Sequence, residues 1–151
     1  MEKCKTINDS KTEQVQIVIA EHTNGVGRLF GGRLIEWMDI IAAVVARRHS
    51  EHEVTTASID KVNFSAPAKL NDTIVISGKI VHVGNTSMNV SVTVYVEKLN
   101  GEQRLINKAN FIMVALDEND KPCRVPRLQL NTDEERSLFE SYETKSIPCK
   151  K

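Results

Sequence analysis

Residues 24–48 read "NGVGRLFGGRLIEWMDIIAAVVARR", and this stretch decides the fold. Four of the chain's seven glycines fall between Gly25 and Gly32, directly before an apolar helical pattern. A glycine-rich loop that opens a helix often binds phosphate. The P-loop spacing fits from Gly27 onward, but arginine and leucine follow where that motif needs lysine and a hydroxyl residue. The dinucleotide motif also fails, because Phe30 stands at its last glycine. The loop therefore serves another chemistry.

The helical pattern is apolar around most of its circumference from Leu34 to Ala46, with a single aspartate, Asp39, inside it. Such a helix is typical of a protein interior rather than a surface. One sheet face cannot cover it completely. We therefore expect the sheet to curl around the helix and a second subunit to cover the remainder.

The rest of the chain shows the two-residue period of β-strands. The clearest case is residues 86–98, where apolar residues from Met88 to Val96 alternate with polar ones. A helix, then strands joined by short turns, predicts an α+β fold with an antiparallel sheet of about five strands around one long helix. Further strands are expected at residues 14–20, 55–64, 72–83 and 103–117, and a short helix capped by Thr132 at residues 131–145.

Composition excludes several classes of protein. Twenty basic and twenty acidic residues leave the 151-residue chain without net charge, whereas nucleic-acid-binding domains usually carry a basic excess. No apolar run approaches the roughly 20 residues of a membrane span, and residues 1–14 lack the apolar centre of a signal peptide. We expect a single cytoplasmic domain that binds neither nucleic acid nor membrane.

The cysteines and histidines predict neither a metal site nor a cofactor. Cys4, Cys123 and Cys149 are scattered and form no C-x-x-C pair, so ordinary free thiols are expected. The four histidines form no H-E-x-x-H motif, and His49 and His52 are expected to face solvent after the helix.

Four motifs resemble the hotdog-fold acyl-CoA thioesterases of the cytosolic acyl-CoA hydrolase type. They are "N-x-x-G-x-x-FGG-x-L-x-x-WMD" from residue 24 to 39, "VNFSAPAKLND" at 62–72, "GNTSM" at 84–88 and "DENDKPCRVPRL" at 117–128. The resemblance implies one hotdog domain over residues 1–128 and a tail over 129–151. It also implies hydrolysis of acyl-CoA to free acid and CoA, at sites between the two subunits of a dimer, with dimers often grouped in threes.

The resemblance gives the catalytic roles to a loop asparagine and a helix aspartate, which here are Asn24 and Asp39. The chemistry suits them, because a thiol of pKa about 8.5 leaves without a dedicated acid. Asp39 would act as general base or as nucleophile, and Asn24 would orient the water or the carbonyl. Gly31 and Gly32 would let a carbonyl reach the N–H groups of the helix terminus.

The turn "GNTSM" offers N–H groups and hydroxyls that suit the amide-rich pantetheine arm of CoA, so Gly84, Thr86 and Ser87 are candidate substrate-binding residues. The CoA phosphates need cations, and sequence does not choose among the candidates. These are Arg28, Arg33, Lys61, Arg124 and Arg127.

Other interpretations remain open at this point. Asp39 could belong to a polar stripe with Glu36 and Arg47, and Asn24 could be part of an ordinary Asn-Gly turn. The same fold supports acyl-thioester dehydratases, for which His22 would be the histidine. It also supports domains that bind acyl-CoA without hydrolysing it.

Overall fold

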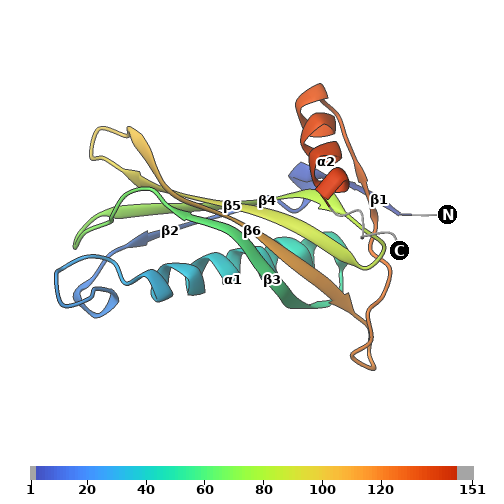
Figure 1. The fold of residues 1–151 in the computed structure, drawn as a ribbon, viewed down its shortest axis with the longest axis horizontal. Helices are drawn as coiled ribbons and strands as arrows, with labels where there is room; N and C mark the ends of the chain where they lie inside the picture. The colour runs from blue at the N-terminus through green and yellow to red at the C-terminus, as the bar shows by residue number, and fades with distance from the viewer. Residues whose placement is uncertain (1–2, 146–151) are drawn as a thin grey trace.

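The computed structural model describes residues 3–145, with side chains as far as Tyr142. A five-stranded antiparallel sheet, in the order β2-β4-β5-β6-β3, lies along the long helix α1 (Figure 1). The second helix, α2, lies on the opposite side of the sheet. The elements are β1 (Cys4–Thr6), η1 (Ile7–Asp9), β2 (Thr12–Ile17), η2 (Ala20–His22), α1 (Gly31–Ser50), β3 (Glu53–Phe64), β4 (Thr73–Val83), β5 (Ser87–Glu97), β6 (Gln103–Leu116), β7 (Arg127–Gln129) and α2 (Asp133–Lys145).

The core lies between α1 and the inner face of the sheet. Trp37, Met38 and Ile41 of α1 are buried there. Gly78 of β4 lets the helix approach closely, since a Cβ on Gly78 would lie 2.6 Å from Cγ2 of Ile41. The alternation predicted for β5 is confirmed, because all five of its apolar residues belong to this core. They are Met88, Val90, Val92, Val94 and Val96.

The C-terminal end of α1 differs from the prediction. The helix continues to Ser50, and His49, expected in solvent, is fully buried. The reason is a parallel pair formed by β1 and β7, which come from opposite ends of the chain. The imidazole Nε2–H of His49 donates to the carbonyl of Pro126, just before β7, over 2.8 Å.

The second helix confirms the predicted cap. The Glu135 N–H donates to Oγ1 of Thr132 over 3.1 Å, and the Glu135 carboxylate accepts from the Thr132 N–H over 3.3 Å. This reciprocal pair is a capping box. The strand β7 runs across the domain boundary predicted at residue 128, and that boundary remains a prediction.

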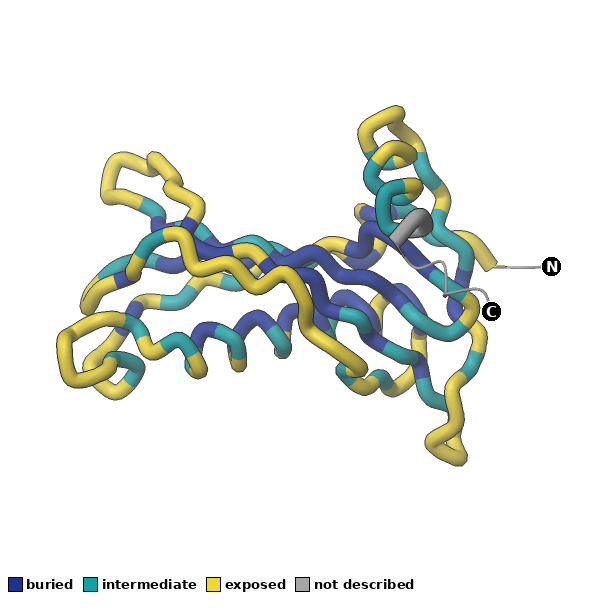
Figure 2. Tube along the Cα trace, in the orientation of Figure 1, coloured by how far each residue is buried: buried dark blue, intermediate teal, exposed yellow. Residues whose placement is uncertain are grey.

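The strand β3 forms one edge of the sheet and is exposed from residue 57 to its end (Figure 2). Its apolar side chains Ile59, Val62 and Phe64 are 36%, 39% and 54% exposed, and Ile40 of α1 is 49% exposed. An edge strand with unpaired backbone groups and apolar side chains is a template for pairing with another chain. No helix within residues 3–145 is long and apolar enough to cross a membrane.

Candidate active site

Asp39 lies at the centre of α1 and contacts the first part of β3. The hydroxyl of Thr56 donates to Oδ1 of Asp39 over 2.7 Å, and Sδ of Met113 lies 3.5 Å from the same hydroxyl oxygen. Asp39 and Thr56 are both half-buried. Within the described residues, Oδ2 of Asp39 accepts no hydrogen bond, so one carboxylate oxygen is fixed and the other is available.

The polar stripe suggested for the outside of the helix exists, but Asp39 makes none of its ion pairs. Glu36 pairs with Arg33 over 3.6 Å, and Arg47 pairs with Glu53 over 3.0 Å. Thr56 was not predicted as a site residue. The sequence signal for it is weak, because Thr55 and Thr56 both carry a hydroxyl at the start of an alternating strand, and the pattern does not reveal that the strand passes the middle of the helix.

Asn24 shapes the loop that precedes α1. Its Oδ1 accepts hydrogen bonds from the N–H groups of Val26 (3.0 Å) and Arg28 (3.2 Å), and its own N–H donates to the Arg28 carbonyl over 2.8 Å. Both lone pairs of Oδ1 are therefore used inside the loop. Asn24 is exposed, and the group that it can offer a substrate is the Nδ2 donor.

The start of α1 offers two backbone donors. Within the described chain, the N–H groups of Gly31 and Gly32 have no hydrogen-bond acceptor, and no side chain caps this terminus. The space freed by the missing side chains is not empty. A Cβ on Gly32 would lie 2.8 Å from the Phe30 ring, and one on Gly31 would lie 3.6 Å from the Phe64 ring. The glycines thus make room for two phenyl rings, while their N–H groups remain unpaired.

A cavity of about 300 Å³ opens beside this terminus. Polar and apolar atoms contribute about equally to its wall, which comes from the glycine loop, the first turn of α1, the end of β3 with the segment after it, and β6. The lining includes Leu29, Gly31, Leu34, Phe64, Ala66 and Ile106.

Within residues 3–145 of one chain, no hydrogen bond joins Asn24 to Asp39. Asp39 lies about 12 Å along the helix axis from Gly31, at 1.5 Å per residue, and Asn24 precedes that terminus in the loop. The strand β3 spans the same interval. Thr56 is near its start beside Asp39, and Phe64 is at its end beside Gly31.

The turn between β4 and β5 contains Gly84 and Thr86, and β5 begins at Ser87, so the three other predicted substrate-binding residues are close together. The Gly84 N–H donates to the carbonyl of Ser87 over 2.9 Å, and the carbonyl of Thr86 accepts from Ala115. Two of the candidate arginines meet this turn. Arg127 donates from Nη2 to the Gly84 carbonyl over 2.6 Å, and Arg124 donates from Nη1 to the side chain of Asn85 over 3.3 Å.

The other candidate cations lie elsewhere. Arg28 forms a backbone bridge with Lys69, Arg33 pairs with Glu36, and Lys61 lies 5.6 Å from the ring centre of Tyr142.

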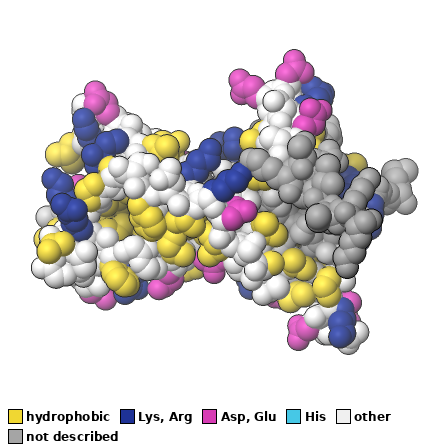
Figure 3. Space-filling view, viewed as in Figure 1, with side chains coloured by type: hydrophobic (Ala, Val, Ile, Leu, Met, Phe, Trp, Pro, Cys, Tyr) yellow, Lys and Arg dark blue, Asp and Glu magenta, His cyan; other side chains and the backbone are white. Residues whose placement is uncertain are grey.

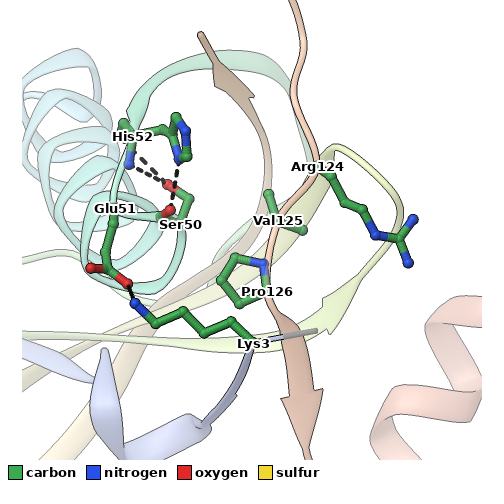
Figure 4. A pocket seen from close by; sticks show the side chains of 7 residues that line it. All are labelled: Lys3, Ser50, Glu51, His52, Arg124, Val125 and Pro126. Atoms are coloured by element: carbon green, nitrogen blue, oxygen red, sulfur yellow. Dashed lines mark hydrogen bonds and ion pairs between the residues drawn. The ribbon is translucent and has the colours of Figure 1, made fainter. Parts of the chain in front are cut away.

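A cavity of about 390 Å³ adjoins the same turn at the C-terminal end of α1 (Figure 4). The two are connected, because the Val125 N–H donates to the Asn85 carbonyl over 2.9 Å. Hydrogen bonds from Lys3 and Lys5 to Glu51 lower the pKa of that carboxyl to about 2. In Figure 4 the Lys3 side chain points to Glu51, whereas Arg124 points away from them. The lining residues are Lys3, Ser50, Glu51, His52, Arg124, Val125 and Pro126.

The histidine that a dehydratase would need is held away from Asp39 of its own chain. Nδ1 of His22 accepts from the Ile19 N–H over 3.2 Å, and its ring packs edge-on against Trp37 with centroids 4.8 Å apart. Trp37 and Asp39 are two residues apart and therefore point to nearly opposite sides of α1. Within residues 3–145, no group of three potential ligands could hold a metal ion.

This chain is similar to known proteins in sequence and in fold. The model of the thioesterase superfamily matches residues 26–102. The chain is 39% identical over 131 residues to the uncharacterised acyl-CoA thioester hydrolase YkhA of Bacillus subtilis, covering 86% of this chain and 76% of the relative. It is 30% identical over 148 residues to the cytosolic acyl coenzyme A thioester hydrolase of Rattus norvegicus, covering 96% of this chain and 39% of the relative.

Solved structures agree in fold. A hexameric acyl-CoA thioesterase without ligand superposes with a TM-score of 0.90 at 37% identity, covering 95% of this chain and 92% of that one. An acyl-CoA hydrolase of Staphylococcus aureus, in complex with butyryl coenzyme A and coenzyme A, superposes with a TM-score of 0.88 at 30% identity, covering 94% and 87%. Alanine variants of that hydrolase replace an asparagine, an aspartate and a threonine. In that hydrolase the asparagine precedes the aspartate by 15 residues, and the aspartate precedes the threonine by 17. Asn24, Asp39 and Thr56 have the same two separations in this chain.

Proposed function

We propose that Asp39 and Asn24 of opposite subunits act on one thioester in this chain, which belongs to the thioesterase superfamily and is an acyl-CoA thioester hydrolase. The proposal rests on the position of the Asp39 carboxylate. Its Oδ1 accepts the hydrogen bond from Thr56, and within the described residues its Oδ2 accepts none. A carboxylate held in this way can take a proton from a water molecule in a defined direction.

The assembly is proposed from the exposed edge of the sheet. Two β3 strands that pair antiparallel about a two-fold axis place the end of one strand beside the start of the other. The loop and helix terminus around Asn24 and Gly31 of one subunit then face Thr56 and Asp39 of its partner. We propose a dimer at least, and a trimer of dimers in view of the hexameric solved relative. Light scattering tests this, and a particle of 16.9 kDa at micromolar concentration would contradict it.

In the proposed reaction, Asp39 is the general base. Its Oδ2 takes a proton from water as the water oxygen bonds to the thioester carbon. The resulting oxyanion accepts hydrogen bonds from the Gly31 and Gly32 N–H groups and from Nδ2 of Asn24, all on the opposite subunit. Since Asn24 has only a donor to offer, it stabilises the carbonyl oxygen rather than the attacking water. The C–S bond then breaks, and the thiolate leaves and takes up a proton.

We propose that the CoA portion binds at the turn between β4 and β5. The hydroxyls of Thr86 and Ser87, beside Gly84, suit the amides of pantetheine. The proximity of Arg124 and Arg127 to this turn makes them the favoured partners for the CoA phosphates. We place the activity in the cytoplasm, in keeping with the cytosolic hydrolase of Rattus norvegicus.

Release of free thiol from a series of acyl-CoA substrates, from acetyl to palmitoyl, tests the proposed function. Hydrolysis of at least part of the series with multiple turnovers is the expected result. Dehydration of a 3-hydroxyacyl-CoA without thiol release would support the dehydratase instead. Stoichiometric binding of acyl-CoA with no thiol release would support a binding domain.

A further inference from the structure

A groove with a mixed polar and apolar lining lies on the outer face of the sheet, on the side opposite α1. It consists of two adjoining cavities of about 400 and 300 Å³, which share Lys108, Leu138 and Tyr142. Leu138 and Tyr142 belong to α2, so this helix forms one wall of both cavities. The combined size is in the range of sites that hold small organic molecules.

The groove concentrates positive charge in a chain whose charges otherwise balance. Four lysines and one carboxylate, that of Glu13, line it, and Lys79 also lines a neighbouring cavity that contains Glu134 and Glu135. None of the four forms an ion pair with a described residue. Figure 3 shows Lys and Arg side chains gathered in the saddle beside α2. The four lysines are Lys11, Lys61, Lys79 and Lys108.

The floor of the groove supplies neutral hydrogen-bonding groups between the lysines. The strand register places Lys79, Ser91 and Asn110 in one row across β4, β5 and β6, and Ser77, Thr93 and Lys108 in the next. Neighbouring strands are about 4.8 Å apart, so these groups form a compact array. Both tyrosines of the chain, Tyr95 and Tyr142, also line the groove.

Asn110 provides a separate indication that the groove is built for a ligand. It is 4% exposed and lines the smaller cavity, yet its Oδ1 has no hydrogen-bond partner. Buried polar side chains almost always have a partner, and an exception calls for an explanation such as a ligand.

The groove is distinct from the catalytic centre. Side chains of successive strand residues point to opposite faces of a sheet. Ser77 and Lys79 line the groove, whereas the intervening Gly78 faces Ile41 of α1. Asp39 and the start of α1 therefore lie on the other side of the sheet.

We infer that this groove binds a small molecule carrying phosphate groups. Lysine ammonium groups interspersed with hydroxyl and amide groups are the partners that phosphate oxygens require. The wall formed by Leu138 and Tyr142 would cover the organic part of the ligand. The chemistry is that of a phosphate ester or diphosphate separate from the acyl-CoA being hydrolysed.

Calorimetric titration of the assembled enzyme with inorganic pyrophosphate tests this inference. The wild type is expected to bind one pyrophosphate per chain. In the double variant Lys79→Gln/Lys108→Gln, affinity should fall by about tenfold for each lysine, the usual worth of a charged hydrogen bond. Lys121→Gln removes an exposed lysine that does not line the groove, so this variant should bind pyrophosphate as the wild type does. If the double variant does not fold, Lys108→Gln alone carries the test.

Competition with coenzyme A separates the groove from the substrate site. Pyrophosphate should bind equally well when coenzyme A is saturating, and the lysine variants should hydrolyse butyryl-CoA at the wild-type rate. Displacement of pyrophosphate by coenzyme A would assign the groove to the substrate's own phosphates and overturn the inference. So would an absence of binding, or an equal loss in Lys121→Gln.

Discussion

Thr56 and Asp39 are joined by a 2.7 Å hydrogen bond that links the first part of β3 to the middle of α1. The hydroxyl hydrogen is used on Oδ1, and the carboxylate is thereby fixed with Oδ2 free. Thr56 in this arrangement is a positioning residue, since it acts on the thioester only through Asp39.

Replacing Thr56 by valine removes the hydroxyl while keeping the branched shape. A hydrogen bond to a charged group contributes about 1.5–3 kcal/mol, so kcat should fall roughly tenfold to a hundredfold. KM should change little, because the binding surface is unchanged. Thr56→Ser, which keeps the donor, should restore most of the lost kcat. Wild-type kcat in the valine variant, or a serine variant that loses as much kcat as the valine variant, would contradict a positioning role for the hydroxyl.

Asp39→Asn keeps the size of the side chain and an oxygen that can accept from Thr56, but removes the base. The proposed mechanism predicts a loss of kcat of about 10²–10⁴-fold with an unchanged far-UV circular dichroism spectrum. Glu36→Gln, three residues earlier on the exposed side of the same helix, is the matched control and should retain full activity. A variant of Asp39 with more than about a tenth of wild-type turnover would exclude it as general base.

Gly78→Ala tests the close contact between β4 and α1. The new methyl group would lie 2.6 Å from Cγ2 of Ile41 and 3.2 Å from Cγ2 of Val45, so the free energy of unfolding should fall by about 1–3 kcal/mol. Adding Ile41→Ala removes the clashing atom, and the double variant should lose less stability than the sum of the two single changes. Gly25→Ala, where no atom lies within 4 Å, is the control for stability. Strict additivity in urea titrations would contradict the contact.

These examples show which features the sequence could predict. The alternation from Met88 to Val96 and the apolar pattern of α1 are local, so both elements follow from periodicity alone. Asp39 and Asn24 stand out because of the motif that contains them. The role of Thr56 and the burial of His49 depend on which segments meet in space, and β1 meets β7 only after the whole chain has folded. The glycines illustrate the same limit, since nothing local reveals that Phe30 and Phe64 fill their space.

His49 should make stability depend on pH. Burial is the main cause that lowers its pKa, and it outweighs the hydrogen bond to the Pro126 carbonyl, which acts in the other direction. The unfolded chain takes up a proton near pH 6.5, whereas the folded chain does not until a lower pH. The unfolded state therefore binds more protons in that interval, and stability falls as the pH drops below about 6.5 and levels off below the folded pKa.

Urea unfolding at about pH 7.5 and about pH 5.5 measures this effect. The His49→Gln variant should be less stable than the wild type at both pH values. Its free energy of unfolding should nevertheless fall less from the higher to the lower pH than that of the wild type. His52→Gln changes an exposed imidazole and should leave the difference as it is. If the His49 and His52 variants show the same difference as the wild type, His49 is not the group responsible.

Mixed oligomers test whether each site is divided between subunits. Asn24→Ala and Asp39→Asn enzymes should each be nearly inactive, because every site lacks one of the two residues. Unfolding and refolding them together gives mixed dimers in about half of random pairings, by the symmetry of a two-fold interface. If the cooperating residues come from opposite chains, one site in each mixed dimer carries both changes and the other carries neither. Roughly a quarter of wild-type activity should therefore return.

The alternative arrangement gives a different result. If Asn24 and Asp39 served one site from the same chain, every site in a mixed dimer would remain damaged, and mixing would restore no activity. Wild-type enzyme and each single variant, refolded alone in parallel, establish that refolding succeeds and that neither variant regains activity by itself. With those controls sound, an absence of recovery would mean that β3 does not bring the Asn24 loop of one subunit to Asp39 of the other.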